Sequence, residues 1–424
     1  MTYEPTLEHA RRRDEADPLR DFRRRFALPH DDRGNPTLFL CGHSLGLMPL
    51  AARTLVTEEL DDWARLAVLG HEHARRPWIP YHENLTAGLT HLTGARPGEV
   101  IAMNSLTVNL HLMLAGFFRP TGRRTRILIE MGAFSSDRHA ATSQLQWHGL
   151  DPEKHLIELA PAPGTDCVPE DAIESCLAQH GEEIALLLWP GVQFRTGQAF
   201  DLPRIARAAR KAGCVVGFDL AHSIGNTPLA LHDSDADFAV WCSYKYLNAG
   251  PGATGGCFVH ERHFTHPHLQ GWWGNETATR FRMEPLFRPA AGAAAWQISN
   301  PPILATAPLV ASLQIFQEAR IERLRAKSLE LTGFLEFLID RLGPDARLIT
   351  PRAVDARGAQ ISIRITGASA TRGRQVFESL LARGVICDWR DPNVIRVAPV
   401  PLYNTFEEVF RFSEQLGEVL RATQ

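Results

Sequence analysis

Lys245 stands between two tyrosines in the stretch WCSYKYLNAGPGATGG, which covers residues 241–256 and follows an apolar run. Burial disfavours a charged ammonium, so a lysine in an apolar setting is a candidate amine nucleophile. Asp219 lies 26 positions earlier, at the end of the apolar run VVGF, where a buried carboxylate needs a cationic or hydrogen-bonding partner. Each residue also has an ordinary explanation, since Asp219 could cap the next helix and Lys245 could lie on the surface at a strand end.

An acid and a lysine at the ends of neighbouring strands form the arrangement that pyridoxal phosphate requires. The lysine forms a Schiff base with this cofactor, and the carboxylate keeps the pyridine nitrogen protonated so that the ring accepts electrons. His222 follows Asp219 by three positions in DLAHS and could support it, although a lone histidine there also fits a structural role. These residues predict a pyridoxal-phosphate site with Lys245 and Asp219 at its centre.

The phosphate group of this cofactor needs a seat upstream, and the segment NSLTVNL offers one. Ser105 and Thr107 begin a predicted helix, where free backbone N–H groups and the helix dipole favour an anion. Tyr244 could donate its phenol to the same phosphate, and Phe134, which follows a predicted strand, could stack on the pyridine ring. The plain alternatives are an ordinary N-cap at Ser105 and a core position for Phe134.

The elements that must position these residues alternate between helix and strand from about residue 95. Helices are expected over residues 105–118, 135–149, 170–181 and 202–213. Apolar strands are expected over residues 126–131, 155–160, 184–192, 214–220, 237–246 and 255–260. Strands this apolar, separated by helices, predict an α/β fold with a mostly parallel sheet that helices cover on both faces. Ligands bind at the carboxyl ends of such strands.

The pattern changes near NPP at residues 300–302, where proline restricts the chain. A long amphipathic helical region to about Leu342 comes first, followed by strands at 347–350, 359–365 and 393–399 and helices at 372–383 and 405–421. We therefore expect an N-terminal segment (1–65) packing with the small domain, a large cofactor-binding domain (66–300) and a small α+β C-terminal domain (301–424).

The composition excludes several function classes. The 424 residues are 44% hydrophobic with a net charge of −3, so no overall positive field favours nucleic acid or an anionic membrane. No apolar run reaches the roughly 18 to 20 residues of a membrane span, and the N-terminus lacks the apolar core of a signal peptide. The seven cysteines form no CxxC pair and the 18 histidines no HExxH spacing. We expect a cytoplasmic protein with reduced thiols and no metal site.

Seven motifs occur in one order along the chain: GHEHARRPW, NSLTVNLHLML, GFDLAHSIGN, VWCSYKYLNAGPGATGG, GWWGNE, ISNPPIL and IRVAPVPLYN. Together they resemble kynureninase, a homodimeric pyridoxal-phosphate enzyme of the aspartate aminotransferase fold (fold type I), from about Cys41 to the C-terminus. The resemblance implies hydrolysis of the Cβ–Cγ bond of L-kynurenine or 3-hydroxykynurenine, which gives anthranilate or 3-hydroxyanthranilate and L-alanine. It implies a place in tryptophan catabolism or NAD biosynthesis.

The resemblance also implies a role for each matching residue. Lys245 would hold the cofactor covalently, Asp219 would pair with the pyridinium, and Tyr244 would donate a proton. The cofactor-binding set would be Leu106, Thr107, Phe134, Asp137, Asp219, His222, Tyr244 and Lys245, with Trp272 and Asn300 reaching over from the second subunit of a homodimer with shared active sites. The substrate-binding set would be Ser44, His71, Asn300 and Arg396, with Arg396 clamping the α-carboxylate through a bidentate pair.

Three positions depart from the family's pattern. His43 stands where asparagine is common, Asn275 where histidine is frequent, and Pro190 at a cofactor-lining position where a small hydroxyl residue also occurs. Asn275 leaves open whether the substrate is kynurenine, 3-hydroxykynurenine or a ring-modified relative. A cysteine desulfurase-like lyase would need a nucleophilic thiol in the small domain, where only Cys387 lies, in the strand-like GVICDWR. An aminotransferase and a non-catalytic cofactor-binding protein are the remaining alternatives.

Overall fold

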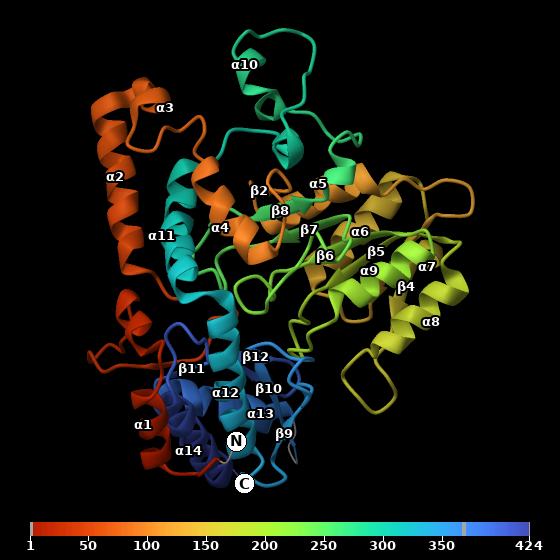
Figure 1. Cartoon of the computed structure of the whole chain (residues 1–424). Helices are drawn as coiled ribbons and strands as arrows, with labels where there is room; N and C mark the ends of the chain where they lie inside the picture. The colour runs from red at the N-terminus through yellow and green to blue at the C-terminus, as the bar shows by residue number, and fades with distance from the viewer. Residues whose placement is uncertain (1–2, 367–369, 424) are drawn as a thin grey trace.

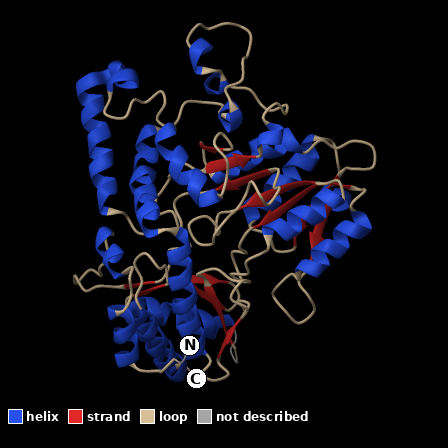
Figure 2. Ribbon diagram, in the orientation of Figure 1, coloured by secondary structure: helices blue, strands red, loops and turns tan. Residues whose placement is uncertain are grey.

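The computed structural model of the chain describes residues 3–366 and 370–423 and is built around a seven-stranded sheet (Figures 1 and 2). In spatial order its strands are β2 (Val100–Ala102), β8 (Gly256–Val259), β7 (Phe238–Trp241), β6 (Val215–Asp219), β5 (Ile184–Pro190), β3 (Arg126–Glu130) and β4 (Leu156–Leu159). Neighbours from β4 to β7 pair in parallel, and β8 is antiparallel to both β7 and β2. The predicted α/β fold with a mostly parallel sheet is confirmed.

Alternate residues of the interior strand β5 enter two separate cores, which explains why this strand is apolar throughout. Leu187 and Trp189 belong to one core, which they share with the helices α4 (Glu83–Thr93), α8 (Glu170–His180), α9 (Leu202–Lys211) and α11 (Ile303–Ala319). Leu186 and Leu188 belong to the other core, with α5 (Leu106–Phe117) and α6 (Ser135–Trp147). Because side chains alternate along a strand, helices must cover both faces of the sheet.

A four-stranded antiparallel sheet organises the C-terminal part, in the order β12 (Asp388–Arg390), β13 (Val394–Val397), β10 (Ile361–Ile365) and β9 (Ala346–Leu348). The helices α12 (Ile321–Ile339), α13 (Ala370–Ala382) and α14 (Phe406–Ala422) share its core. α14 begins with a capping box between Thr405 and Glu408. The N-terminal helix α1 (Leu7–Glu15) packs against α14, so the two ends of the chain lie together (Figure 1).

The two sheets are connected by a helical region in two pieces. Its helices α11 and α12 are separated at Arg320, whose φ of +66° cannot continue a helix. The helix α2 (Leu50–Leu66) packs along α11, and the short strand β1 (Leu38–Phe39) pairs in parallel with β11 (Val385–Ile386). The N-terminal segment therefore contacts both parts of the molecule, and the domain boundaries after residues 65 and 300 stay a prediction.

Three one-turn helices lie in the connecting segments: α3 (Gly70–His73), α7 (Pro152–His155) and α10 (Thr277–Arg280). Figure 1 shows α10 with its flanking loops projecting from the body of the molecule. Within the part of the chain that the structure describes, every helix is too short or too polar to cross a bilayer.

Candidate active site

A pocket opens at the carboxyl ends of β3, β5 and β6, where a ligand site of a parallel sheet is expected. Its lining comes from these strand ends, from the starts of α5 and α6, and from the turn after β7. The lining residues are Leu106, Thr107, Glu130, Phe134, Ser136, Asp137, Pro190, Val192, Phe194, Asp219, Ala221, His222, Tyr244 and Lys245. Eight predicted cofactor residues, from four separate stretches of sequence, meet here.

Two aspartates, Asp219 and Asp137, line the pocket and hydrogen-bond to each other through their side chains. Asp219 ends β6, is buried, and accepts the N–H of Ala221 at its Oδ1 (2.7 Å), so it closes the following turn rather than capping a helix. Asp137 lies in the first turn of α6 and is also buried. Burial and the charge of Asp219 raise the pKa of Asp137 well above its usual range. Burial raises the pKa of Asp219 as well, but the charge of Lys245, the N–H of Ala221 and the hydrogen bond from Asp137 oppose that rise. Of the two, Asp219 is therefore the one that more readily holds the negative charge.

A third carboxyl group, that of Glu130, was not predicted. Glu130 ends β3, is 3% exposed, and accepts a hydrogen bond from Nε2 of Gln193 (3.2 Å). Burial raises the pKa of Glu130 to about 8, and the charge of Asp219 adds to the rise. The sequence did contain a signal, because Glu130 follows the apolar run ILI just as Asp219 follows VVGF.

Lys245 lies in the turn that follows β7, four residues past the strand end. Its Nζ is 5.8 Å from the ring centroid of Phe134 and 5.8 Å from that of Tyr244. Its side chain is half-buried, so the expected burial is only partial. Gly46 donates its N–H to the carbonyl of Tyr244 (2.8 Å), and a Cβ at Gly46 would lie 2.3 Å from the carbonyl oxygen of Lys245. Glycine therefore lets the N-terminal segment approach the lysine turn.

Phe134 is a pocket residue rather than a core residue. The residue is 40% exposed, and its ring meets the ring of Phe194 edge-on, with centroids 5.2 Å apart. His222 lies in the turn after Asp219 and is buried, and burial together with the charge of Lys245 holds the pKa of His222 well below its usual range. A neutral imidazole and an exposed aromatic ring thus flank the lysine.

The start of α5 provides a seat for an anion. Ser105 occupies the N-cap position, but its side chain makes no capping hydrogen bond, so the first-turn N–H groups receive no side-chain cap. Thr107 donates from its Oγ1 to Oγ of Ser136 (3.2 Å), which brings the start of α6 next to the start of α5. Two helix N-termini and two hydroxyl groups therefore border the same part of the pocket, as binding of a phosphate requires.

These features allow a test of whether pyridoxal phosphate fits. Three buried carboxyl groups share the pocket with the ammonium of Lys245, and Oδ1 of Asp137 has no hydrogen-bond partner among the described residues. A protonated ring nitrogen would supply a further cation at these carboxyl groups, and a phosphate would complete the start of α5. Pro190 and Val192 add apolar walls, as expected for Pro190. The residues present fit the cofactor.

Arg396 and Ser44 do not line this pocket. Arg396 lies on β13, is 1% exposed, and donates to the carboxylate of Asp388 and to the carbonyl oxygen of Phe194. Because Phe194 lines the pocket, the guanidinium lies just behind the pocket wall. Ser44 is exposed, and its backbone N–H donates to the carbonyl of Cys41 (2.9 Å).

His71, Trp272 and Asn300 line a different hollow of about 450 Å³, which shares no lining residue with the first. Trp272 is 44% exposed and donates its Nε1–H to the carbonyl of Arg280 (2.9 Å). Within a single chain, the structure therefore separates these three residues from Lys245.

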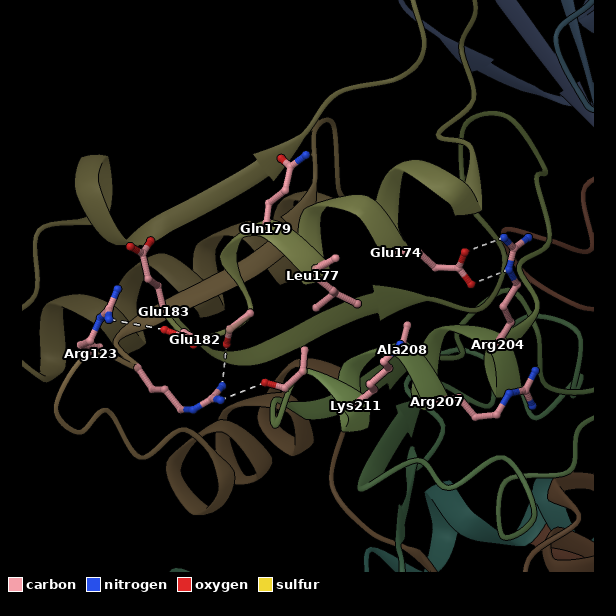
Figure 3. A pocket seen from close by; sticks show the side chains of 14 residues that line it. Arg123, Glu174, Leu177, Gln179, Glu182, Glu183, Arg204, Arg207, Ala208 and Lys211 are labelled. Atoms are coloured by element: carbon pink, nitrogen blue, oxygen red, sulfur yellow. Dashed lines mark hydrogen bonds and ion pairs between the residues drawn. The ribbon is translucent and has the colours of Figure 1, made fainter.

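A larger hollow of about 1110 Å³ lies between α8 and α9 (Figure 3). Charged side chains line it, and several of them pair with one another, as Arg204 does with Glu174 and Arg123 with Glu182. Its lining includes Glu183, which directly precedes β5, so it lies at the amino ends of the strands. Ligands of this type of sheet bind at the opposite edge, and this hollow is not the candidate active site.

The chain has the fold of the pyridoxal-phosphate enzymes of fold type I. The cystine C–S lyase C-DES, solved with glycine covalently linked to its pyridoxal-phosphate cofactor, has a TM-score of 0.76 with 17% identity over 90% of this chain and 96% of its own. The cysteine desulfurase CsdA of Escherichia coli has a TM-score of 0.75 with 16% identity over 96% of this chain and 98% of its own. At such low identity these likenesses show the fold alone.

Sequence comparison identifies the particular family. The kynureninase of Xanthomonas euvesicatoria pv. vesicatoria is 56% identical over 411 residues, which are 96% of this chain and 97% of the relative. That of Xanthomonas axonopodis pv. citri is 55% identical over 419 residues, 98% and 99% of the two chains. The family model "Kynureninase C-terminal domain" matches residues 324–416. The chain belongs to the kynureninase family, and its cofactor is pyridoxal phosphate.

Proposed function

We propose that this enzyme hydrolyses the Cβ–Cγ bond of L-kynurenine, 3-hydroxykynurenine or both, releasing anthranilate or 3-hydroxyanthranilate and L-alanine. The observation that carries the proposal is that Lys245 and the Asp219–Asp137 pair share one pocket in a chain 56% identical to a kynureninase along nearly its whole length. Pyridoxal phosphate, when bound, supplies an electron sink for charge that develops at the substrate's Cα.

In this proposal each residue of the pocket has a separate role. Asp219 keeps a negative charge where the ring nitrogen would lie, and Asp137 holds it there by donating a hydrogen bond. The start of α5, with Thr107, holds the phosphate. Lys245 takes up the proton from Cα once its amine is free, and the O–H of Tyr244 returns a proton to the remaining carbon fragment.

Substrate recognition in this scheme uses groups outside the pocket lining. Arg396 clamps the α-carboxylate, and Ser44 and His71 border the aromatic ring. The Oδ1 of Asn275 accepts a hydrogen bond from the backbone N–H of Arg288 (3.0 Å), so this side chain already has a partner within its own loop. That arrangement supports an indirect role for Asn275.

The desulfurase alternative receives no support from the small domain. Cys387 is 6% exposed and lies between β11 and β12. Burial raises the pKa of its thiol far above the usual range, because a thiolate there would lose its hydration. A buried thiol held between two strands is unsuited to collect sulfur from a substrate.

We further propose a cytoplasmic homodimer in which Trp272 and Asn300 complete the active site of the partner. Large apolar side chains around the second hollow support this: Val68 is 73% exposed, Leu69 58% and Phe281 51%. Exposed apolar patches of this kind mark protein contacts. A second copy would cover this surface and bring Trp272 and Asn300 towards another chain's pocket.

The test is turnover of the two substrates in separate reactions. We expect alanine and the fluorescent aromatic amine in equal amounts from at least one of them. Lys245→Ala should lose at least about 100- to 10,000-fold in rate because a general base is removed, and Tyr244→Phe should lose about 100- to 1,000-fold but stay measurable. Lys211→Ala, an exposed lysine at the hollow of Figure 3, is the control. Wild-type turnover by Lys245→Ala would refute the assignment.

A further inference from the structure

His43 is a fully buried histidine next to the candidate active site. It follows β1 in the chain, its side chain is 0% exposed, and neither ring nitrogen has a hydrogen-bond partner among the described residues. Its Nε2 lies 3.8 Å from Oδ2 of Asp388, and its ring centroid lies 6.3 Å from that of His222. An unpartnered buried imidazole is costly, so its position calls for a role that this state of the protein does not use.

The role of His43 depends on Arg396, which is hydrogen-bonded to Asp388 in this structure. Arg396 donates from Nη2 to Oδ2 of Asp388 and from Nη1 to the carbonyl oxygen of Phe194, while its Nε has no hydrogen-bond partner among the described residues. Arg390 also donates to Oδ2 of Asp388 (3.3 Å). Both ends of the Arg396 guanidinium are therefore occupied by the protein itself.

A bidentate pair with a substrate carboxylate requires Arg396 to give up one of these partners. Release of Asp388 would leave a carboxylate that is mostly buried with only Arg390, itself partly exposed, as a donor. Loss of a charge-assisted hydrogen bond in a buried site is expensive, so another donor must be available nearby. The Nε2 of His43 is the neighbouring group that needs to move only about 1 Å to reach hydrogen-bond distance.

We propose that His43 is a positioning residue. It donates a hydrogen bond to the carboxylate of Asp388 when Arg396 leaves Asp388 and binds the carboxylate of a ligand. This inference rests on the proposed function, because it takes Arg396 as the carboxylate clamp. His43 touches neither cofactor nor substrate in this scheme. It sets how readily Arg396 is released and therefore how tightly carboxylate ligands bind.

The charges around His43 predict how this exchange responds to pH. The titratable and charged groups that face it are Cys41 on its own segment, His222 and Lys245 from the turns after β6 and β7, and Asp388, Arg390 and Arg396 from the small sheet. Burial and the charges of Arg396, Lys245 and Arg390 hold the pKa of His43 well below its usual range, so it is neutral. A carboxylate on Arg396 neutralises one of these cations and favours protonation of His43.

The sign of the effect follows from linkage. If a carboxylate ligand raises the pKa of His43, then ligand binding takes up a proton, and the ligand must bind more tightly as the pH falls through the range between the two pKa values. Replacement of His43 by an uncharged side chain removes this dependence. A purely structural role for His43 would change stability but not the number of protons taken up.

The experiment measures binding of 4-oxo-4-phenylbutanoate to the holoenzyme by titration calorimetry. This probe has the carboxylate and the γ-carbonyl of a kynurenine but no α-amine, so the chemistry of Lys245 does not enter. For wild type we expect proton uptake, read from buffers with different ionisation enthalpies, and about 3- to 10-fold tighter binding near pH 6 than near pH 8. His43→Asn should bind the probe more weakly near pH 6 and without proton uptake.

His266→Asn is the matched control, because His266 is a half-buried histidine with a lowered pKa on the other side of the sheet, stacked on Phe117. His43→Gln repeats the test with a second amide if the asparagine variant binds no cofactor. In kynurenine turnover, both amide variants should raise KM near pH 6 more than they lower kcat. Unchanged proton uptake in both amide variants, or its absence in wild type, would overturn the inference. The proposed function fails separately, if wild type releases no aromatic amine from a kynurenine.

Discussion

Glu130, Asp137 and Asp219 place three carboxyl groups around a pocket that contains one ammonium, that of Lys245. Three ionised carboxylates could not coexist there, because like charges in a buried site disfavour one another. The protein responds by protonation: the pKa of Asp137 lies well above its usual range and that of Glu130 near 8. Of the three, Asp219 is the carboxyl group whose ionised form is supported by Lys245, the N–H of Ala221 and Asp137, and it lies beside the place proposed for the ring nitrogen.

Glu130 makes the stability of the cofactor-free protein depend on pH. Its pKa rises from 4.5 to about 8 on folding, so the folded state holds a proton that the unfolded state releases. The stability linked to this proton is present in full below about pH 4.5 and is lost as the pH rises through about 8. Glu130→Gln should remove that loss, on the order of 3 to 5 kcal/mol, from the pH profile of chemical unfolding. The control is Glu182→Gln, at an 80% exposed site; equal slopes for Glu130→Gln and wild type would contradict the prediction.

At the level of residues, the sequence was informative where a polar group interrupts an apolar run. Lys245, Asp219 and His222 were predicted in this way, and the structure brings all three into one pocket. Glu130 was not predicted as a site residue, because a single acid at the end of a strand can equally lie on the surface. The unpartnered ring of His43 could not be predicted, since it depends on Asp388 from β12, more than 300 residues away.

At the level of elements, the seat for the phosphate depends on how closely β8 approaches the start of α5. Gly255, just before β8, exchanges two backbone hydrogen bonds with the turn that precedes α5: its N–H donates to Asn104 (2.7 Å) and its carbonyl accepts from Met103 (3.0 Å). Asn104 adopts a φ of +47° in that turn and donates from Nδ2 to Asn109 (3.0 Å). The turn is therefore fixed from both sides before any ligand binds.

Gly255→Ala should displace this turn. A Cβ there would lie 2.7 Å from the carbonyl oxygen of Trp241 and 3.2 Å from the backbone nitrogen of Leu106, so the backbone must move between the end of β7 and the start of α5. We expect weaker cofactor binding by up to about 100-fold, the cost that a shift of about 1 Å can have, measured by titration of the apoenzyme with pyridoxal phosphate. Gly417→Ala in α14 is the control, because its closest contact is the movable side chain of Leu342. Equal affinities in the two variants would show that the turn is not needed.

The elements of the sheet were largely predictable, and the exceptions have a physical cause. The strands β3 to β8 and the helices α6, α8 and α9 lie within about three residues of their expected ends, except β7, because uniform burial gives each strand a long apolar signature. The one-turn helix α7 was not expected. β7 ends at Trp241 rather than near residue 246, since the chain must turn to present Lys245. The strands β1, β2, β11 and β12 have two or three residues each, too few for a periodic pattern.

At the level of the whole molecule, all predicted site residues except Ser44 and Arg396 divide into two groups that one chain does not unite. Eight line the pocket of Lys245, while His71, Trp272 and Asn300 line the second hollow among exposed apolar side chains. The motifs of the sequence carry no information on this division, because they record which residues matter but not which chain supplies them. An exchange of residues between two copies would reunite the groups.

Shared active sites can be tested by mixing two inactive variants. Lys245→Ala removes a residue of the first pocket and Asn300→Ala a residue of the second hollow, so each variant alone should be nearly inactive. If Asn300 serves the partner's pocket, a mixed dimer contains one intact site and one doubly altered site. Random reassociation makes half the dimers mixed, so the activity should return to about a quarter of wild type.

The control is a mixture of Lys245→Ala with Asp219→Asn. These two changes lie in the same pocket, so this mixture should stay inactive. No recovery in mixed dimers that mass spectrometry has verified would place Asn300 in its own chain's site.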